Sequence, residues 1–86
     1  MSTKIVGEFS PGQCRAGRAL LEITQTELAV LAGLGLSTVV DFEKKRRKVL
    51  PESVESIRRA LVRAGIEFIE ENGGGPGVRL RKGLKK

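Results

Sequence analysis

The side chains of this sequence with the most evident chemistry are five consecutive cations at residues 44–48, KKRRK. Lysine and arginine donate hydrogen bonds to phosphate oxygens, so such a run favours a polyanionic partner. The simpler interpretation is a solvated surface. We favour the first, because the run directly follows a predicted helix instead of lying in a tail. The charge is also uneven: residues 1–43 have a net charge of −2 and residues 44–86 a net charge of +8, within a total of +6.

Side chains suited to catalysis are scarce. The chain has no His, Tyr or Trp, and its single cysteine, Cys14, has no His partner that could activate it as a nucleophile. One Cys without His also argues against a zinc site, and carboxylates occur in no recognisable catalytic pair. We therefore expect no enzyme, no cofactor and no metal. We expect Cys14 to be a buried structural thiol.

Two short helices are predicted just before the basic run. Thr24 and Glu27 form a capping box that begins a helix over 25–32, and Gly33 suits the left-handed residue that ends it. A second helix fits 36–44. Short helices joined by a tight turn that contains Gly are typical of a helix-turn-helix, which presents its second helix to the DNA major groove. The apolar positions at helical spacing are Leu28, Leu31 and Ala32 in the first helix, and Val39 and Phe42 in the second.

Helices are also predicted on both sides of this pair. Ser10 as N-cap with Pro11 and Gln13 begins a helix over 11–21. Pro51 begins another over 51–64, which Gly65 ends. The expected buried faces are Cys14, Gly17, Leu20 and Leu21 in the first of these helices, and Leu50, Val54, Ile57, Leu61 and Ala64 in the second.

The last part of the chain changes period. Residues 66–71 and 78–82 alternate in part and flank the segment NGGGPG, which predicts a β-hairpin. This loop lacks the helix and the Lys-Ser/Thr pair of a phosphate-binding loop, so we expect no nucleotide. The expected organisation is an N-terminal arm over 1–10, with a short strand at Ile5-Val6, a helical domain over 11–65, the hairpin over 66–82 and a basic tail over 83–86. We expect no membrane span and no signal peptide, and hence a cytoplasmic protein.

The stretch from about Pro11 to Ala64 resembles the phage-repressor-like (Xre/Cro/CI) helix-turn-helix proteins. The resemblance implies a mainly α, four-to-five-helix lambda-repressor-like domain, here with a C-terminal β-hairpin. It implies a sequence-specific regulator of transcription, with repression as the first expectation, that binds double-stranded DNA and no small molecule. The matching pieces are Thr24-Gln25-x-Glu27-Leu28-Ala29, Ala32-Gly33, Ser37-Thr38-Val39 and Phe42-Glu43.

The resemblance also assigns roles to single residues. Arg18 would pair with Glu43 and tie the first helix to the third, whereas the alternative is two unrelated surface charges. Gln25 would clamp a phosphate and brace the recognition helix over 36–44. The base-reading positions fall on Leu36, Ser37 and Asp41. The positions expected at the DNA backbone are Gln25, Thr38, Lys44, Lys45, Arg46 and Arg47.

The sequence departs from the family pattern at the start of the recognition helix. Gly35 stands where Ser or Thr is usual, which weakens the N-cap only slightly. Leu36 and Val40 are apolar on the face that should meet DNA, and such side chains contact thymine methyl groups without bidentate hydrogen bonds. One hypothesis is a T-containing site read with modest direct specificity. The other is a protein contact: an interaction or antitoxin-like module on the same scaffold, with weak DNA binding.

The hairpin is the expected dimerisation element. Proteins of this kind usually bind half-sites ~34 Å apart as two-fold dimers. Adjacent residues of a strand point to opposite faces, so one hairpin face would cover the fourth helix and the other would meet a second copy. The alternative is a hairpin packed wholly on its own helices, which leaves a monomer. The apolar residues expected at this interface are Ile66, Phe68, Ile69, Val78 and Leu80.

Overall fold

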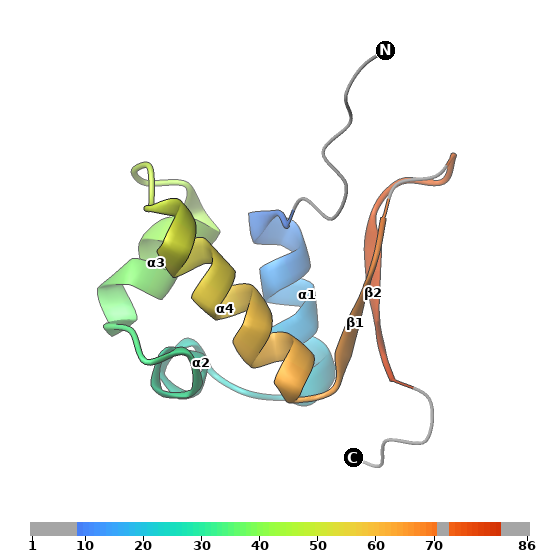
Figure 1. The fold of residues 1–86 in the computed structure, drawn as a ribbon, viewed down its shortest axis with the longest axis horizontal. Helices are drawn as coiled ribbons and strands as arrows, with labels where there is room; N and C mark the ends of the chain where they lie inside the picture. The colour runs from blue at the N-terminus through green and yellow to red at the C-terminus, as the bar shows by residue number, and fades with distance from the viewer. Residues whose placement is uncertain (1–8, 71–72, 82–86) are drawn as a thin grey trace.

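The computed structural model of the chain describes residues 9–70 and 73–81. The fold is mainly helical, with four helices followed by a small antiparallel sheet of two strands (Figure 1). The predicted bounds of the first three helices are confirmed, and the fourth ends one residue earlier than predicted. The elements are α1 (Pro11–Leu21), α2 (Gln25–Ala32), α3 (Leu36–Lys44), α4 (Pro51–Arg63), β1 (Ile66–Ile69) and β2 (Gly77–Leu80).

Both predicted capping boxes are present. At α1 the Ser10 hydroxyl accepts from the Gln13 N–H at 3.1 Å, and the Gln13 side chain accepts from the Ser10 N–H at 3.0 Å. Thr24 and Glu27 exchange the same two bonds at the start of α2. Such caps satisfy donors that the first turn of a helix leaves free, and each is worth about 1 kcal/mol. Gly33 ends α2 at φ 71°, in the left-handed region as predicted.

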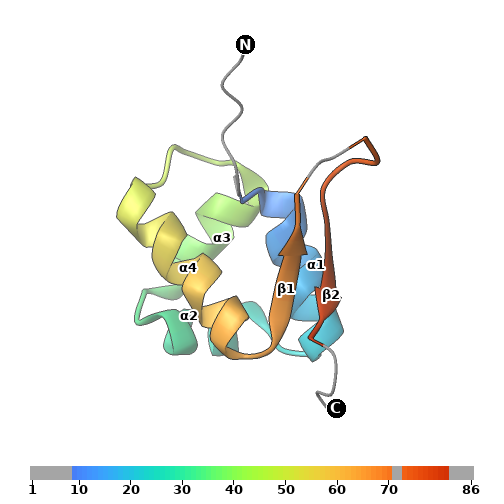
Figure 2. The same ribbon diagram turned by 45° about the vertical axis from the view of Figure 1, so that its right-hand side comes forward.

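The core lies between the helices and the sheet. Figure 2 shows β1 between α4 and β2, with α1 behind the sheet, while α2 and α3 cover the other side of α4. The innermost side chains come from every helix and from β1, so the sheet is part of the core. The fully buried residues are Cys14, Leu28, Val39, Glu43, Ile57, Leu61 and Ile66.

Three predicted core residues are exposed. Leu20 lies at the edge of the buried face of α1. Leu31 is about 110° around the helix from the centre of the buried face of α2, at 100° per residue. Leu50 is the N-cap of α4 with an extended backbone, so it does not belong to the helix face. Val49, which the spacing did not indicate, is buried in its place.

The predicted hairpin is confirmed, and four of its five apolar residues share the face that meets the helices. The strands pair Ile66 with Leu80 and Phe68 with Val78, and directly opposite residues share a face. These four side chains pack against the helical core, which leaves Ile69 as the expected interface residue on the outer face. The outer face also carries an ion pair between Glu67 and Arg79 at 2.8 Å. Four of the five expected interface residues therefore pack against the helices of their own chain.

Phe9 belongs to the core although it was expected in an arm. Its ring stacks on Phe42 of α3 at 5.4 Å between centroids and meets the edge of Phe68 of β1 at 5.0 Å. Aromatic pairs in these geometries are favourable beyond their burial. The rest of the expected arm, with its Ile5-Val6 strand, and the basic tail over 83–86 lie outside the described residues.

Candidate nucleic-acid interface

A single carboxylate, that of Glu43 near the end of α3, joins three helices. Arg18 of α1 donates to both of its oxygens at 2.8 Å, so the expected ion pair is present. Gln25, the first residue of α2, donates to Oε1 at 2.9 Å. The Cys14 thiol donates to Oε2 at 2.9 Å, and Arg15 donates to the Glu43 backbone carbonyl at 2.5 Å. The side chain of Glu43 is only 1% exposed.

The charge of Glu43 is maintained by its donors. Burial would raise the pKa of its carboxyl group, but the hydrogen bonds from Arg18, Cys14 and Gln25 outweigh burial and lower that pKa below its ordinary value. The bond to Glu43 raises the pKa of Arg18. Burial, with the bond to Glu43, raises the pKa of the Cys14 thiol, which therefore stays protonated. The thiol is buried, as expected for Cys14, and it serves as a donor to Glu43.

This buried cluster (Cys14, Arg18, Gln25 and Glu43) fixes α3 relative to α1 and α2. Two parallel bonds from a guanidinium to a carboxylate set an angle as well as a distance. The resemblance implied that Gln25 braces α3, and its amide N–H points inward and donates to Glu43. The sequence did not predict the roles of Cys14 and Arg15, because both contacts are made only when α1 and α3 pack together.

The opposite side of α3 faces solvent at its beginning. Leu36 is 45% exposed, Ser37 is exposed, and Thr38 and Val40 are half-buried. No side chain caps this helix, because Gly35 is its N-cap. The expected base-reading positions Leu36 and Ser37 are thus accessible, and the apolar character inferred for this face is present at Leu36.

Asp41, the third expected base-reading residue, already has partners inside the chain. Its Oδ2 lies 2.7 Å from Nε of Arg47, and its Oδ1 lies 4.0 Å from Nη1 of Arg46. The Asp41 side chain is 17% exposed. Lys45 ends α3 in the left-handed region at φ 56°, and the Arg46 N–H then bonds back to the Asp41 carbonyl at 3.0 Å. This turn brings the chain back toward Asp41. A left-handed residue at the end of a helix is usually Gly, so Lys45 at this position gives no sign of the turn in the sequence.

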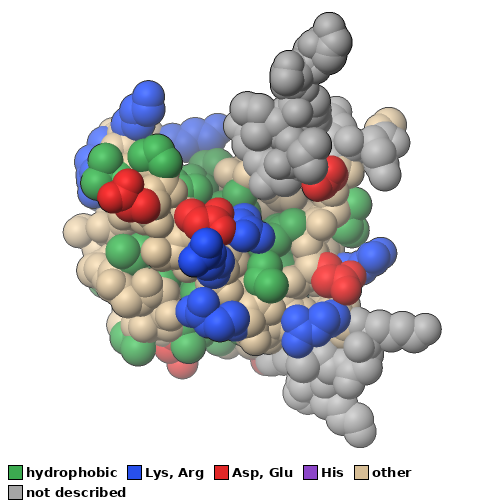
Figure 3. Space-filling model, viewed as in Figure 1, with side chains coloured by type: hydrophobic (Ala, Val, Ile, Leu, Met, Phe, Trp, Pro, Cys, Tyr) green, Lys and Arg blue, Asp and Glu red, His purple; other side chains and the backbone are tan. Residues whose placement is uncertain are grey.

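The basic loop (residues 44–48) forms a strongly charged projection. All five of its side chains are exposed. Within the described part of the chain, Arg46 and Arg47 pair with Asp41, while Lys44, Lys45 and Lys48 form no ion pair. Figure 3 shows Lys and Arg side chains gathered at the upper left, where the loop between α3 and α4 lies in Figure 1. Exposed cations that follow an accessible helix face can contact phosphates on either side of a groove.

Comparison with known proteins adds no family. No protein-family model matches the chain, and a search of curated proteins finds no match. Across residues 9–70 and 73–81, no helix is long and apolar enough to cross a membrane, and no group of His, Cys, Asp and Glu could hold a metal ion.

Proposed function

We propose that this protein is a sequence-specific regulator of transcription of the lambda-repressor-like helix-turn-helix class, acting on double-stranded DNA in the cytoplasm. In this proposal α2, the turn through Gly33 and α3 form the DNA-binding unit. The exposed start of α3 enters the major groove, where Leu36 and Ser37 meet the base edges. The basic loop contacts the DNA backbone, together with Thr38 and the first turn of α2 at Gln25.

The observation that carries the proposal is the shared carboxylate of Glu43. The resemblance to phage-repressor-like proteins assigned Arg18 and Glu43 to one pair and Gln25 to the bracing of α3. Arg18 and Glu43 are 25 residues apart in the sequence, and Gln25 and Glu43 are 18 apart, yet all three side chains meet within 2.9 Å. The bond from Gln25 to Glu43 holds α2 against α3, which supports a helix pair that presents one face.

The electrostatic surface supports the same partner. Five exposed cations follow α3 directly, and only two of them are paired within the described residues. Each Lys or Arg that neutralises a phosphate releases counterions, which makes affinity for DNA strongly salt-dependent. Asp41 neutralises part of this loop in the free protein. In this proposal Asp41 therefore neutralises Arg46 and Arg47 in the free protein and does not contact the base edges.

A second candidate function rests on Leu36. Its 45% exposure puts an apolar side chain where direct reading would favour a polar one. A protein-interaction or antitoxin-like module would use this side chain, with Val40, against another protein and would bind DNA weakly. Under the DNA proposal the same side chain contacts a thymine methyl group.

Selection of bound duplexes from a random pool tests the proposal. We expect enrichment of a short motif that contains T where Leu36 meets the bases. Titration of the selected duplex over salt should give a slope of log K against log [salt] of about −0.9 for each phosphate contact. No enrichment, together with weak binding that does not depend on salt, would favour the protein-interaction module.

A further inference from the structure

The start of α3 is an apolar surface with open space before it. Leu36 is the first residue of the helix and is exposed. Val40 lies one turn further on, and side chains four positions apart share one face of a helix. A Cβ added at Gly33 or Gly35 would meet no atom within 4 Å beyond the glycine and its chain neighbours. The turn before Leu36 therefore leaves room for a base edge to approach this side chain.

The polar side chains beside Leu36 are poorly suited to identify a base pair. The strongest discrimination comes from hydrogen bonds of amide, carboxylate or cationic side chains. The amide of Gln25 is turned inward to Glu43, and Asp41 is held in its ion pairs with the basic loop. The exposed hydroxyl group of Ser37 remains. Among the described residues this hydroxyl has no hydrogen-bond partner, and it can either donate or accept.

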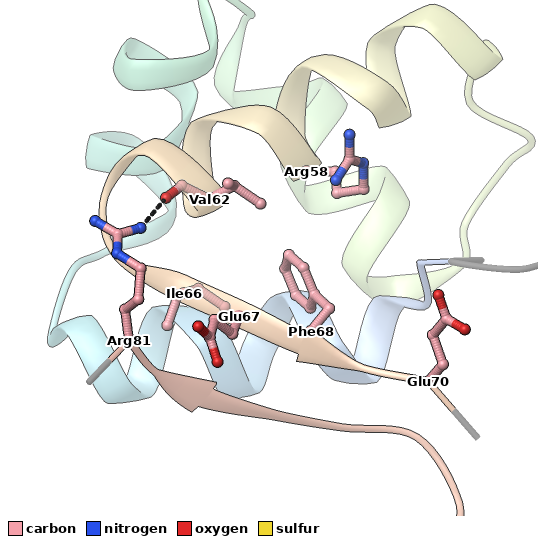
Figure 4. Close-up of a pocket in the computed structure, with 7 residues that line it drawn as sticks. All are labelled: Arg58, Val62, Ile66, Glu67, Phe68, Glu70 and Arg81. Carbon is pink, nitrogen blue, oxygen red and sulfur yellow. Dashed lines mark hydrogen bonds between the residues drawn. The ribbon is translucent and has the colours of Figure 1, made fainter. Parts of the chain in front are cut away.

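The guanidinium groups of the chain lie away from this surface or are already bonded. The basic loop begins eight residues after Leu36, ~12 Å further along the helix axis. Arg58 bonds to Glu55, and Arg81 donates to the Val62 carbonyl at one end of a groove of about 380 Å³ between β1 and α4 (Figure 4). Leu36 is thus left to distinguish one base pair from another. The other arginines outside the loop that bond within the chain are Arg15, Arg18, Arg59, Arg63 and Arg79.

An apolar side chain in the major groove recognises a methyl group. Thymine carries one at C5, and a cytosine methylated at C5 carries the same group at the same place. The two bases differ at C4, where thymine has an oxygen that accepts and cytosine has an amino group that donates. The hydroxyl group of Ser37 can bond to either of them. None of the described side chains on this surface therefore separates 5-methylcytosine from thymine.

We propose that this protein reads the methylation of cytosine. It binds a duplex that carries 5-methylcytosine where Leu36 meets the bases, and it binds the same duplex without that methyl group more weakly. The inference rests on the proposed function, because it needs the start of α3 in the major groove. Asp41 would oppose this reading if it were free, because a carboxylate accepts from the cytosine amino group with or without the methyl group. Its ion pairs with the basic loop keep it from that role.

The size of the effect follows from the apolar surface that one methyl group buries. Burial of a group of this size strengthens binding about 4-fold. Two comparisons isolate it. Thymine and uracil both pair with adenine, and 5-methylcytosine and cytosine both pair with guanine. Within each pair the group at C4 is also the same, so only the methyl group differs.

The test uses the full chain and the duplex enriched from the random pool. Each thymine in turn is replaced by uracil, which removes one methyl group. At the position that responds, the T·A pair is then replaced by C·G, with the cytosine either unmodified or methylated at C5. In fluorescence anisotropy we expect thymine to bind about 4-fold more tightly than uracil, and 5-methylcytosine about 4-fold more tightly than cytosine.

Two variants assign the effect to its side chain. Leu36→Ala should abolish both preferences and keep the helical circular dichroism, because the side chain is exposed at the first position of α3. Leu31→Ala is the matched control. It removes the same kind of side chain at nearly the same exposure, 48% against 45% for Leu36, from α2. The Leu31 carbonyl accepts from Arg63 of α4, and both preferences should remain in this control.

Three results would overturn the inference and leave the proposed function standing. The first is an enriched duplex that shows neither preference. The second is a pair of preferences that persists in Leu36→Ala or is lost in Leu31→Ala. The third is a preference for thymine over uracil without one for 5-methylcytosine over cytosine. If no duplex is enriched at all, the proposed function is wrong and this inference falls with it.

Discussion

Replacement of Glu43 by Gln is the most direct test of how this fold is held together. The substitution keeps the size of the side chain and removes its charge. Arg18 would then lie in a largely buried position without a counterion, and the thiol of Cys14 and the amide of Gln25 would lose a charged acceptor. Breaking a buried pair by removing one partner costs roughly 3–5 kcal/mol. An 86-residue domain has a free energy of unfolding of roughly 4–13 kcal/mol. We therefore expect the Glu43→Gln variant to lose about a quarter or more of its free energy of unfolding.

Urea denaturation followed by circular dichroism measures this loss as a lower midpoint at unchanged slope. Glu67→Gln is the matched control. It removes a carboxylate from an ion pair of the same 2.8 Å length with Arg79, but Glu67 is 41% exposed, and exposed pairs contribute about 0–1 kcal/mol. A second variant, Arg18→Met with Glu43→Leu, removes both charges together. It should recover at least half of the lost stability, because no buried charge is left unpaired.

The reasoning fails if Glu43→Gln and Glu67→Gln lower the midpoint equally. It also fails if the double variant is less stable than Glu43→Gln alone. Either result would mean that the carboxylate of Glu43 contributes shape rather than charge to the junction of α1, α2 and α3.

Three further predictions concern pH and DNA. The pKa of Glu43 is lower in the folded state than in the unfolded chain. Its contribution to the free energy of unfolding should therefore be complete above the unfolded carboxyl pKa of about 4.3, and it should be lost as the pH falls through the folded value. Urea midpoints measured from pH 7 to pH 2 should show this loss in the wild type and not in Glu43→Gln. Alanine substitution of the loop cations should weaken binding to all duplexes and flatten the salt slope by roughly one unit for each phosphate that is no longer neutralised, measured by fluorescence anisotropy; the residues are Lys44, Arg46 and Arg47. Asp41→Asn should tighten binding to all duplexes without changing the preferred sequence, because it releases Arg46 and Arg47 from their ion pairs. A changed preference in the duplex selection would instead indicate that Asp41 contacts the base edges.

The parts of the fold that could be predicted from sequence are those fixed by neighbouring residues. The capping boxes at Ser10 and Thr24 and the left-handed Gly33 involve atoms three or four residues apart, so the helix bounds followed from local chemistry. The pair of Arg18 with Glu43 is long-range and was expected only through resemblance. Neither residue carries a local signal of its partner.

The parts that could not be predicted depend on turns without a sequence signal or on strand register. Lys45 adopts a left-handed conformation that sequence assigns to Gly or Asn, and this brings Arg47 to Asp41. The hairpin was expected from 66–71 and 78–82, but β2 begins at Gly77, and the pairing of Phe68 with Val78 decides which side chains face the helices. A strand pattern without its register leaves that choice open.

The burial of Ile66 changes what should be regarded as the smallest folding unit. The sequence predicted a helical domain over 11–65, followed by the hairpin as a further element. Such a fragment would lack Phe9, Ile66 and Phe68, and full burial of each large apolar side chain contributes about 1.5–3 kcal/mol. Ile66 packs against the interior side of the helices, so its removal would open the core rather than trim a surface. Expression of a minimal domain should therefore begin before Phe9 and extend through Leu80.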